Sequence, residues 1–170
     1  MRDRSGCEFS RRGRLEGSTS EFSVAQLATL APASNPKAIS AAVKNAQSKG
    51  VKIIYVDSGA EVPAIATLST NNFQAGALAG KTMIDELKAA GKSAGKIGIV
   101  SVNTATNSTM ERENGFRGVV SAAGYTILTT EYKDGDAAAS QEAATGFISG
   151  NADLVGLYGA NEGSTVGVGN

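Results

Sequence analysis

The sequence contains no histidine, no tryptophan and a single cysteine among its 170 residues. The lack of histidine excludes a histidine general base, a histidine metal ligand and a histidine pH switch. Cys7 has no second thiol, so neither an intrachain disulfide nor a cysteine metal site can form. Two common routes to catalysis and metal binding are therefore closed to this chain.

Excess charge of either sign is also absent, because 16 basic residues balance 16 acidic ones. Nucleic-acid binders usually carry excess positive charge for the phosphate backbone, so we expect no nucleic-acid partner. No run approaches the roughly 18 apolar residues of a membrane helix, and the N-terminus lacks the apolar core of a signal peptide. What remains is the composition of an ordinary globular domain, 41% hydrophobic and 19% charged.

The first 23 residues are a different kind of sequence. They contain five of the seven arginines and show neither helical nor strand periodicity. We interpret residues 1–23 as an unstructured leader or an artificial extension of the chain. The alternative is a basic tail for acidic partners.

From Val24 onward, short apolar segments alternate with longer amphipathic segments that end at glycine. This alternation predicts β-α-β units and an α/β fold, with a parallel sheet and helices on both faces in Rossmann-like lobes. Strands are predicted near residue 27 and at 51–56, 96–102, 125–131 and 153–158. The near-continuous apolar run 51–56 is typical of a strand covered on both sides by helices. Segment 58–70 is predicted to be a crossover connection.

Helix starts carry capping signals. Asn35 precedes Pro36 at the start of the first helix, Asn71 or Asn72 precedes the second, and Asp136 precedes the fourth. In the third helix, Ser108 and Glu111 have the spacing of a capping box. The buried stripe predicted for the second helix is Phe73, Ala77, Gly80, Ile84 and Leu87.

Polar side chains gather directly after the predicted strands. They are Asp57 and Ser58, then Asn103, Thr106 and Asn107, then Asp134 and Asp136, then Asn161 and Glu162. The carboxyl ends of parallel strands form the ligand-binding edge of an open α/β sheet, and carboxylates and amides there suit the hydroxyls of a neutral polyol. The alternative for each residue is a helix cap. Asp57 is the exception, because no helix is predicted after it.

Signatures of catalysis and nucleotide binding are missing. The GKIGIVSVN segment lacks the ending of a phosphate-binding loop, no G-x-G-x-x-G follows a strand, and no serine lies in G-x-S-x-G. Asp134 and Asp136 form a pair suited to acid-base work or a cation, but turn and cap preferences also explain this KDGD segment. We expect no catalytic residue, no metal and no cofactor.

Four segments carry a resemblance to a known family: LAPASNPKAISAAVKNAQSKGVKIIYVDS, TNNFQAGALAGK, STMERENGF and LYGANEG. From about Ala28 to its end, the chain resembles the periplasmic sugar-binding proteins of the ribose-binding type, which share their two-lobed fold with LacI-type repressor cores. The resemblance implies a small sugar or polyol bound in a cleft between lobes. It also implies a hinge closure that the membrane permease of an ABC importer recognises.

The resemblance implies a set of binding residues. Asp57 matches a carboxylate, and Asn161 an amide, that bind sugar hydroxyls. The other members of the implied set are Ser58, Asn107, Thr109 and Arg112.

Three departures from the family pattern argue against ribose itself. Ser58 and Met110 stand where ribose binders have arginines, and Gly135 stands where an aromatic ring stacks on the sugar. The alternative for Arg112 is a structural ion pair with Glu111 or Glu113.

The resemblance also implies that the chain is incomplete. Family members carry two further βα units before the position of Leu27 and a strand-rich segment after that of Asn170. We interpret residues 24–70 as a partial first lobe with the crossover, and 71–170 as a second lobe without its last strands. Exposed sheet edges would follow, so we expect the chain to form a homo-oligomer.

The predicted function is the solute-binding component of an ABC importer, present as a fragment of a periplasmic or extracellular, lipid-anchored parent. The alternative is the effector-binding core of a LacI-type transcriptional regulator. That reading needs a helix-turn-helix module, for which residues 1–23 are too short and unpatterned. A third hypothesis, an α/β enzyme acting on sugars, depends only on the strand-end carboxylates.

Overall fold

The computed structural model describes residues 27–30, 37–57 and 59–170, with side chains from residue 37 onward. The predictions for residues 1–23, Asn35, Pro36 and Ser58 lie outside the described residues. The elements are β1 Leu27–Leu30, α1 Ser40–Ser48, β2 Lys52–Val56, β3 Ala66–Leu68, α2 Asn72–Ala89, β4 Lys96–Ser101, α3 Asn107–Ala122, β5 Thr126–Ile127, β6 Glu131–Tyr132, α4 Ala137–Gly150, β7 Leu154–Gly159 and α5 Glu162–Gly169. Within these ranges, none of the helices has the length and hydropathy to cross a bilayer.

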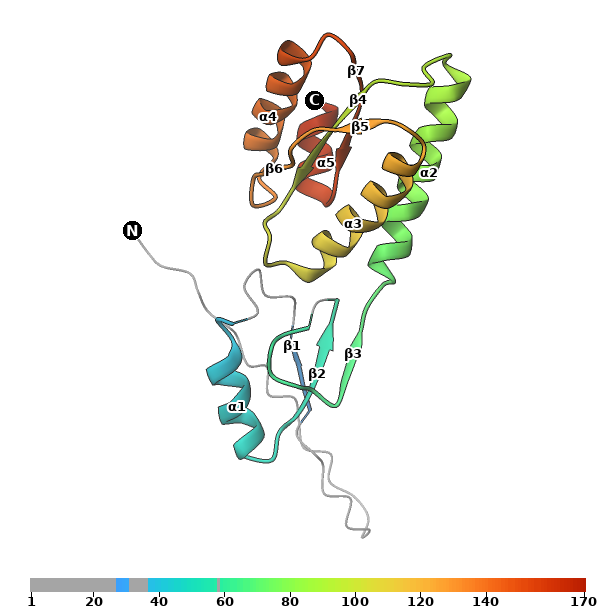
Figure 1. Ribbon diagram of the computed structural model, residues 1–170. Coiled ribbons are helices and arrows are strands. Elements are labelled where there is room, and N and C mark those ends of the chain that lie inside the picture. Colours follow the sequence, from blue (N-terminus) through green and yellow to red (C-terminus); the bar gives the residue numbers. More distant parts are fainter. Residues whose placement is uncertain (1–26, 31–36, 58) are drawn as a thin grey trace, which may run out of the picture.

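The elements form two sheets, one in each of two units (Figure 1). The first unit contains β1, α1, β2 and β3, and the second contains the elements from α2 onward. All the described strand pairs are parallel. The predicted α/β fold with parallel sheets is confirmed.

The first sheet has the order β1-β2-β3, and α1 packs on one of its faces. Ile53 and Tyr55 of β2 are buried against Val43 of α1, whereas Val56 is 39% exposed. The Tyr55 hydroxyl donates to the Val62 carbonyl at 2.7 Å. In the described chain, therefore, only one face of β2 is covered by a helix. The second helix predicted beside the 51–56 strand is not among the described elements.

A strand also lies within the predicted crossover connection. β3 pairs with Ile54–Val56 of β2, and the Ile65 N–H extends this pairing by donating to the Ile53 carbonyl at 2.9 Å. Leu68, at its end, is 61% exposed. A strand of three residues with little burial has no hydrophobic period to detect, so the sequence does not reveal it.

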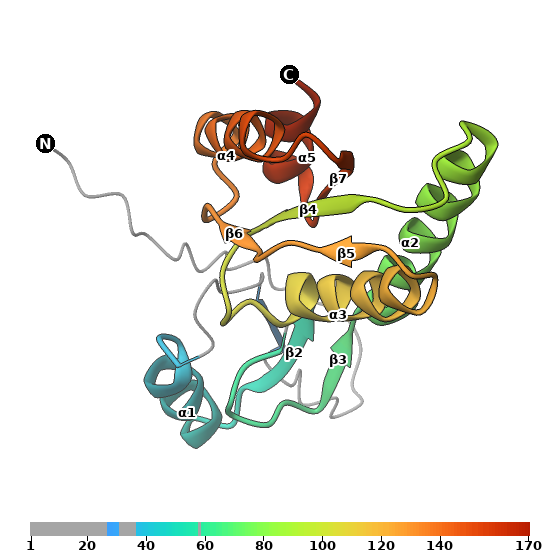
Figure 2. The ribbon, with the colours of Figure 1, turned by 45° about the horizontal axis from the view of Figure 1, so that its top comes forward.

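β4 is the central strand of the second sheet. β7 pairs along one edge of β4, and β5 and β6 pair in succession along the other. Figure 2 shows α2 and α3 on one face of this sheet and α4 and α5 on the other. The predicted single strand 125–131 is corrected to two, because β5 ends at Ile127 and β6 begins at Glu131. Between them the Thr130 hydroxyl turns to donate to Glu113 of α3 at 2.6 Å.

The core of the second unit lies between α2, α3 and the sheet. It consists of Ile84, Leu87, Ile97, Ile99, Phe116, Val120 and Tyr125. Ile97 and Ile99 of β4 have no exposed surface, as expected for a strand covered on both faces. The Phe116 ring stacks on Tyr158 of β7 with centroids 4.0 Å apart.

α2 and α3 cross closely through two glycines. A β-carbon at Gly76 would overlap the Arg112 carbonyl, and one at Gly115 would overlap the Phe73 carbonyl. Only glycine permits this approach of the two backbones.

The close crossing also corrects the predicted stripe of α2. The stripe is confirmed at Gly80, Ile84 and Leu87. It is wrong at Phe73, which is 49% exposed, while Asn72 and Gly76 are buried in its place. Where two helix backbones touch, small residues occupy the shared face and a large ring is displaced outward.

Candidate functional site

The carboxyl ends of the two sheets face each other. In Figure 1, β2 and β3 point toward the second unit, while β4 and β7 run toward the first. The segments that follow β2, β4, β6 and β7 begin at Asp57, Val102, Lys133 and Ala160, respectively. We call them the facing edges. Parallel α/β sheets bind ligands at this end of their strands.

Asp57 follows β2 in an uncommon backbone conformation. Its φ of 73° lies in the left-handed region, which ordinary residues avoid. Its N–H donates to the Leu68 carbonyl at 2.8 Å, so the pairing with β3 extends to this residue. Strained residues held by neighbouring structure recur at binding sites.

Asn103 organises the loop after β4. Its Oδ1 accepts from the N–H groups of Ala105 and Thr106, each at 2.9 Å. Its Nδ2 donates to Asp134 Oδ1 at 3.3 Å, which joins this loop to the one after β6. Asn103 appears in the sequence among the polar residues after strands, but its capping preference hides its role of linking two loops.

The start of α3 differs from the prediction. Asn107 is the first helical residue, and Ser108 and Glu111 form no capping box. Instead the exposed Asn107 donates from Nδ2 to Glu111 Oε1 at 3.1 Å. Thr109 is 3% exposed, and its hydroxyl donates to the Thr106 carbonyl at 3.1 Å. Its hydroxyl hydrogen is therefore already used within the helix start.

Asn161 lies at the corner between β7 and α5. Its Oδ1 caps α5 by accepting from the Ser164 N–H at 3.1 Å. Its Nδ2 has no hydrogen-bond partner among the residues that the structure describes. A β-carbon at Gly135 would lie 2.8 Å from this Nδ2. Gly135 also has a φ of 75°, in the left-handed region that favours glycine.

Caps account for other strand-end residues. Asn71 caps α2 by accepting from the Gln74 N–H at 3.0 Å, and Asp136 caps α4 by accepting from the Ala139 N–H at 2.8 Å. Asp134 has a left-handed φ of 50°. The turn and cap interpretation of the KDGD segment is confirmed.

Arg112 forms neither of the ion pairs considered for it. Its Nε donates to Asn72 Oδ1 at 2.8 Å, and its Nη1 donates to the Ala160 carbonyl at 3.2 Å. The ion pair of α3 is instead Arg117 with Glu113, at 2.9 Å. Arg112 therefore connects the start of α2 to the corner that carries Asn161.

Glu113 is the centre of a buried polar cluster behind the facing edges. It is 3% exposed and accepts from Arg117, from Thr130, and from the Tyr132 hydroxyl at 3.3 Å. Burial, followed by the Glu113 carboxylate, raises the pKa of Tyr132. Burial also raises the pKa of Tyr158, although the nearby Arg112 charge opposes this. Both phenols therefore remain neutral hydrogen-bond donors at physiological pH.

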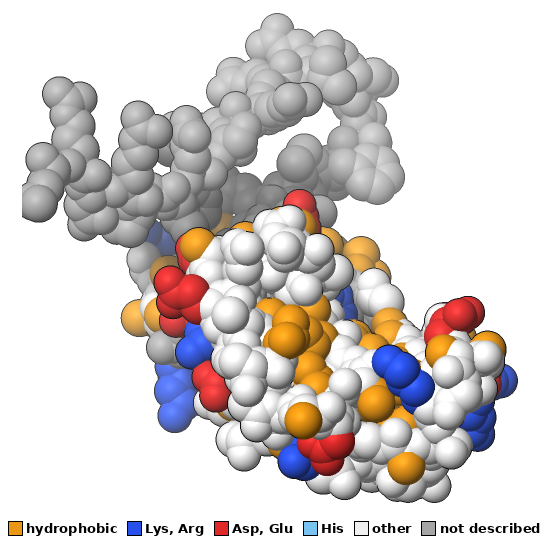
Figure 3. Space-filling model, turned by 90° about the horizontal axis from the view of Figure 1, so that it is seen from above, with side chains coloured by type: hydrophobic (Ala, Val, Ile, Leu, Met, Phe, Trp, Pro, Cys, Tyr) orange, Lys and Arg blue, Asp and Glu red, His pale blue; other side chains and the backbone are white. Residues whose placement is uncertain are grey.

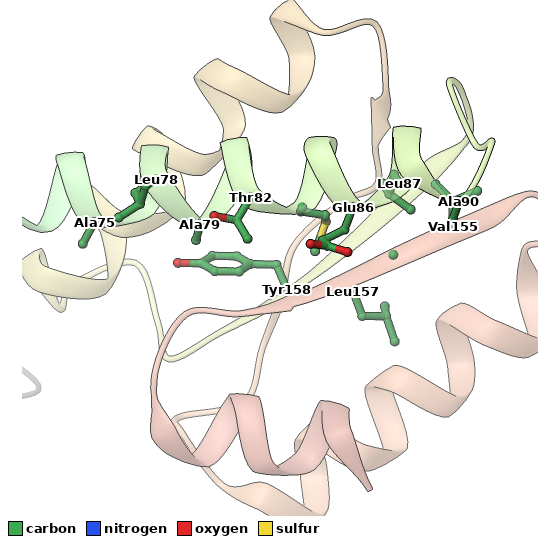
Figure 4. A pocket seen from close by; sticks show the side chains of 12 residues that line it. Ala75, Leu78, Ala79, Thr82, Glu86, Leu87, Ala90, Val155, Leu157 and Tyr158 are labelled. Carbon is green, nitrogen blue, oxygen red and sulfur yellow. The ribbon is translucent and has the colours of Figure 1, made fainter.

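An apolar groove lies away from the facing edges. It has a volume of about 900 Å³ and runs between α2 and β7. Figure 4 shows Leu78, Thr82 and Glu86 of α2 and Val155 and Tyr158 of β7 around it. Figure 3 shows the molecule from above, with a hydrophobic patch near the middle of that face.

Residues 30–170 match the family described as the periplasmic binding protein domain. This match covers most of the chain, and the chain belongs to that family. The two parallel sheets with facing carboxyl ends agree with this assignment. Comparison with the curated proteins gave no match.

Solved structures share the fold. An ABC transporter solute-binding protein from Agrobacterium vitis with bound D-fucose is 32% identical, with a TM-score of 0.75 over 83% of this chain and 49% of that one. A carbohydrate transporter solute-binding protein from Agrobacterium radiobacter in complex with D-arabinose is 31% identical, with a TM-score of 0.71 over 78% and 46%. AraP, an arabinose-binding protein from Geobacillus stearothermophilus, is 28% identical, with a TM-score of 0.67 over 81% and 47%.

The chain spans about half the length of the solved structures that it matches. The family match and these structures do not favour the effector core of a transcriptional regulator.

Proposed function

We propose that this chain is part of a solute-binding protein of an ABC importer and that it binds a small sugar or polyol without converting it. The observation that carries the proposal is the opposition of two carboxyl edges, with Asp57 on one and Asn103, Asp134 and Asn161 on the other. Carboxylates accept, and amides both accept and donate, the hydrogen bonds of hydroxyl groups. The relatives with bound D-fucose and D-arabinose support this ligand class.

The proposed contacts follow from the groups available. Asp57 accepts from sugar hydroxyls, and Asn161 donates from Nδ2, since its Oδ1 is committed to the cap of α5. Asn107, exposed at the start of α3, borders the ligand at the rim of the site. Ser58 lies outside the described residues and is kept in the proposed set from the family resemblance alone. Thr109 hydrogen-bonds within the protein, so we assign it no direct contact.

The proposed organisation is a partial first lobe, residues 24–70, and a second lobe, residues 71–170, preceded by a leader, residues 1–23. Closure of the lobes around the sugar is the output that a membrane permease recognises. The parent protein works in the periplasm or outside the cell, and neither catalysis nor a cofactor is part of the mechanism.

Isothermal titration of this chain with a panel of pentoses, hexoses and polyols tests the proposal. We expect heat of binding for at least one sugar, and unchanged sugar in the mixture afterwards. Asp57→Ala should weaken that binding by about tenfold or more, because a lost polar pair costs about 1–3 kcal/mol. Asp85→Ala, which removes an exposed carboxylate of α2, is the matched control and should bind normally. A panel without any binding would contradict the proposal, and turnover of the sugar would favour an enzyme.

Self-association is part of the same proposal. In the described chain β7 pairs only with β4, so its other edge is open. Beside that edge lies the apolar groove with Leu78, which is 66% exposed. Unpaired strand edges join readily to other strands, and two identical edges can pair around a two-fold axis. We assign the β7 edge as the contact between two copies.

A further inference from the structure

Within the described chain, one covalent connection joins the two sheets, the segment 69–71 between β3 and α2. Its direction of entry into α2 determines how the two carboxyl edges are placed. Asn72, the first residue of α2, is 1% exposed. Its Nδ2 donates to the Thr70 carbonyl at 3.1 Å, so a buried side chain holds the connection.

Arg112 of α3 binds this same side chain. Its Nε donates to Asn72 Oδ1 at 2.8 Å, and its Nη1 donates to the Ala160 carbonyl at 3.2 Å. Ala160 is 3% exposed and directly precedes Asn161. Because the guanidinium is planar and rigid, these two bonds fix the connection and the Asn161 corner relative to each other.

The helix crossing fixes the backbone from which Arg112 extends. Gly76 of α2 lies against the Arg112 carbonyl, and Gly115 of α3 lies against the Phe73 carbonyl. Neither helix can move closer to the other at this level. This contact sets the closest separation of the backbones that carry Arg112 and Asn72.

A direct contact between the ligand and the Nε of Arg112 is disfavoured by the same bonds, so any contact would have to come from the terminal nitrogens, chiefly Nη2. Nε and Nη1 already have partners in the protein. Releasing Nε to a sugar would leave the buried Asn72 oxygen unpaired, and such a group costs about 1–3 kcal/mol.

We propose that Arg112 is a positioning residue that sets the angle between the two units through Asn72 and Ala160 and does not touch the ligand. The expected effect of Arg112 on sugar affinity rests on the proposed sugar-binding function. Its effect on the angle does not depend on any ligand.

The angle is measured first, without sugar, on the full chain carrying Cys7→Ser. Spin labels are placed at the exposed positions Lys44→Cys of α1 and Glu142→Cys of α4. Arg112→Ala and Asn72→Leu should each broaden or shift the distribution of label distances. Arg112→Lys, which keeps the charge but loses the planar fork, should retain part of the original distribution and serves if Arg112→Ala fails to fold. Glu111→Gln, also on α3, is the control and should leave the distribution of label distances unchanged.

An unchanged distribution in folded Arg112→Ala and Arg112→Lys would overturn the proposal, whether or not any sugar binds. Affinity gives the second readout. A positioning role lowers the affinity for every bound sugar of the panel by a similar factor, about tenfold, as expected for the loss of a charged hydrogen bond. A loss confined to one sugar would identify Arg112 as a ligand contact and contradict the inference. Failure of the wild-type chain to bind any sugar would instead contradict the proposed function.

Discussion

Asp57 combines a carboxylate with a backbone conformation that suits glycine. At its φ of 73°, the β-carbon of an ordinary L-residue approaches the following carbonyl, which costs about 1–2 kcal/mol. Asp and Asn tolerate this conformation better than other residues. Residue 57 therefore carries a side chain at some cost in stability. We attribute the presence of a side chain there to the proposed role of its carboxylate in binding the ligand.

Two substitutions separate the carboxylate from the backbone strain. Asp57→Ala and Asp57→Gly both remove the carboxylate, but glycine accepts the left-handed conformation and alanine does not. We expect Asp57→Ala to be less stable than Asp57→Gly by about 1 kcal/mol in urea unfolding. Both should bind sugar about tenfold or more weakly than the wild type in titration. Equal stability of the two variants would show that residue 57 is not strained.

Asn161 has two separable tasks, because its oxygen caps α5 and its Nδ2 is left for a ligand. Asn161→Asp keeps the capping oxygen, and Asp is as good a cap as Asn. We expect unchanged stability in thermal unfolding but sugar affinity reduced by about tenfold, since one amide donor is lost. Asp136→Asn, at the cap of α4, is the matched control and should change neither property. Normal affinity in Asn161→Asp would remove Asn161 from the site.

At the scale of elements, the sequence predicts what periodicity and capping encode. The strand 96–102 and the long helix from Asn71 to Gly91 agree with β4 and α2, because buried strands and capped helices leave regular patterns. β3 is missed because it is short and exposed, and the gap between β5 and β6 is missed because Thr130 bonds to Glu113, 17 residues away. Phe73 is misassigned because hydrophobicity does not show where two backbones touch.

The same limits apply to the site. The caps at Asn71, Asp136 and Asn161 follow from residue type and position. The link from Asn103 to Asp134 and the bonds of Arg112 to Asn72 and Ala160 join residues 31 to 48 positions apart. Such contacts depend on how the elements pack, which local sequence does not specify.

The crossing of α2 and α3 depends on glycine at Gly76. Gly76→Ala would place a β-carbon on the Arg112 carbonyl, and overpacking of this kind costs about 1–3 kcal/mol. Gly118→Ala, in α3 and with open space around its β-carbon, is the control and should be stabilising by about 0.5–1 kcal/mol. Chemical denaturation of both variants measures the difference. If Gly76→Ala were as stable as Gly118→Ala, the two helices could separate at no cost, and the prediction would be wrong.

Tyr55 gives the first sheet a dependence on alkaline pH. Burial raises the pKa of Tyr55 above its ordinary value of 10.0, and its hydroxyl donates to Val62. A raised pKa means that the folded state favours the neutral phenol. This stabilisation is complete below about pH 10 and is lost as the pH rises through the raised pKa of the folded state. We expect the free energy of unfolding, measured in urea, to fall above about pH 10 less steeply in Tyr55→Phe than in the wild type. Parallel curves would mean that Tyr55 does not contribute.

At the scale of the whole molecule, the apolar groove beside β7 and the facing edges are two different kinds of surface. The facing edges are polar and carry the proposed ligand site, whereas the groove is apolar and lies along an open sheet edge. Exposed apolar surface of this kind usually marks a contact with another chain.

Self-association through the groove is tested by a charge at Leu78. The wild-type chain should show a mass that rises with concentration in sedimentation velocity. Leu78→Glu should shift it toward the monomer, because a carboxylate in an apolar contact is costly to desolvate. Ile148→Glu, at a 62% exposed residue of α4 on the other face of the sheet, should associate like the wild type. A monomeric wild-type chain at all concentrations would contradict the assignment.

Among the described residues, the segment 69–71 is the one connection between the units, and this has a mechanical consequence. Two parallel connections would restrict the relative motion of the units to a hinge rotation about one axis. One connection also permits a twist about its own length. A ligand that contacts both facing edges would supply a second restraint on the relative motion of the units. Arg112 and Asn72 are proposed to set the angle at which the connection enters α2, whereas a bound ligand would limit the remaining twist about the connection, at the cost of part of its binding free energy.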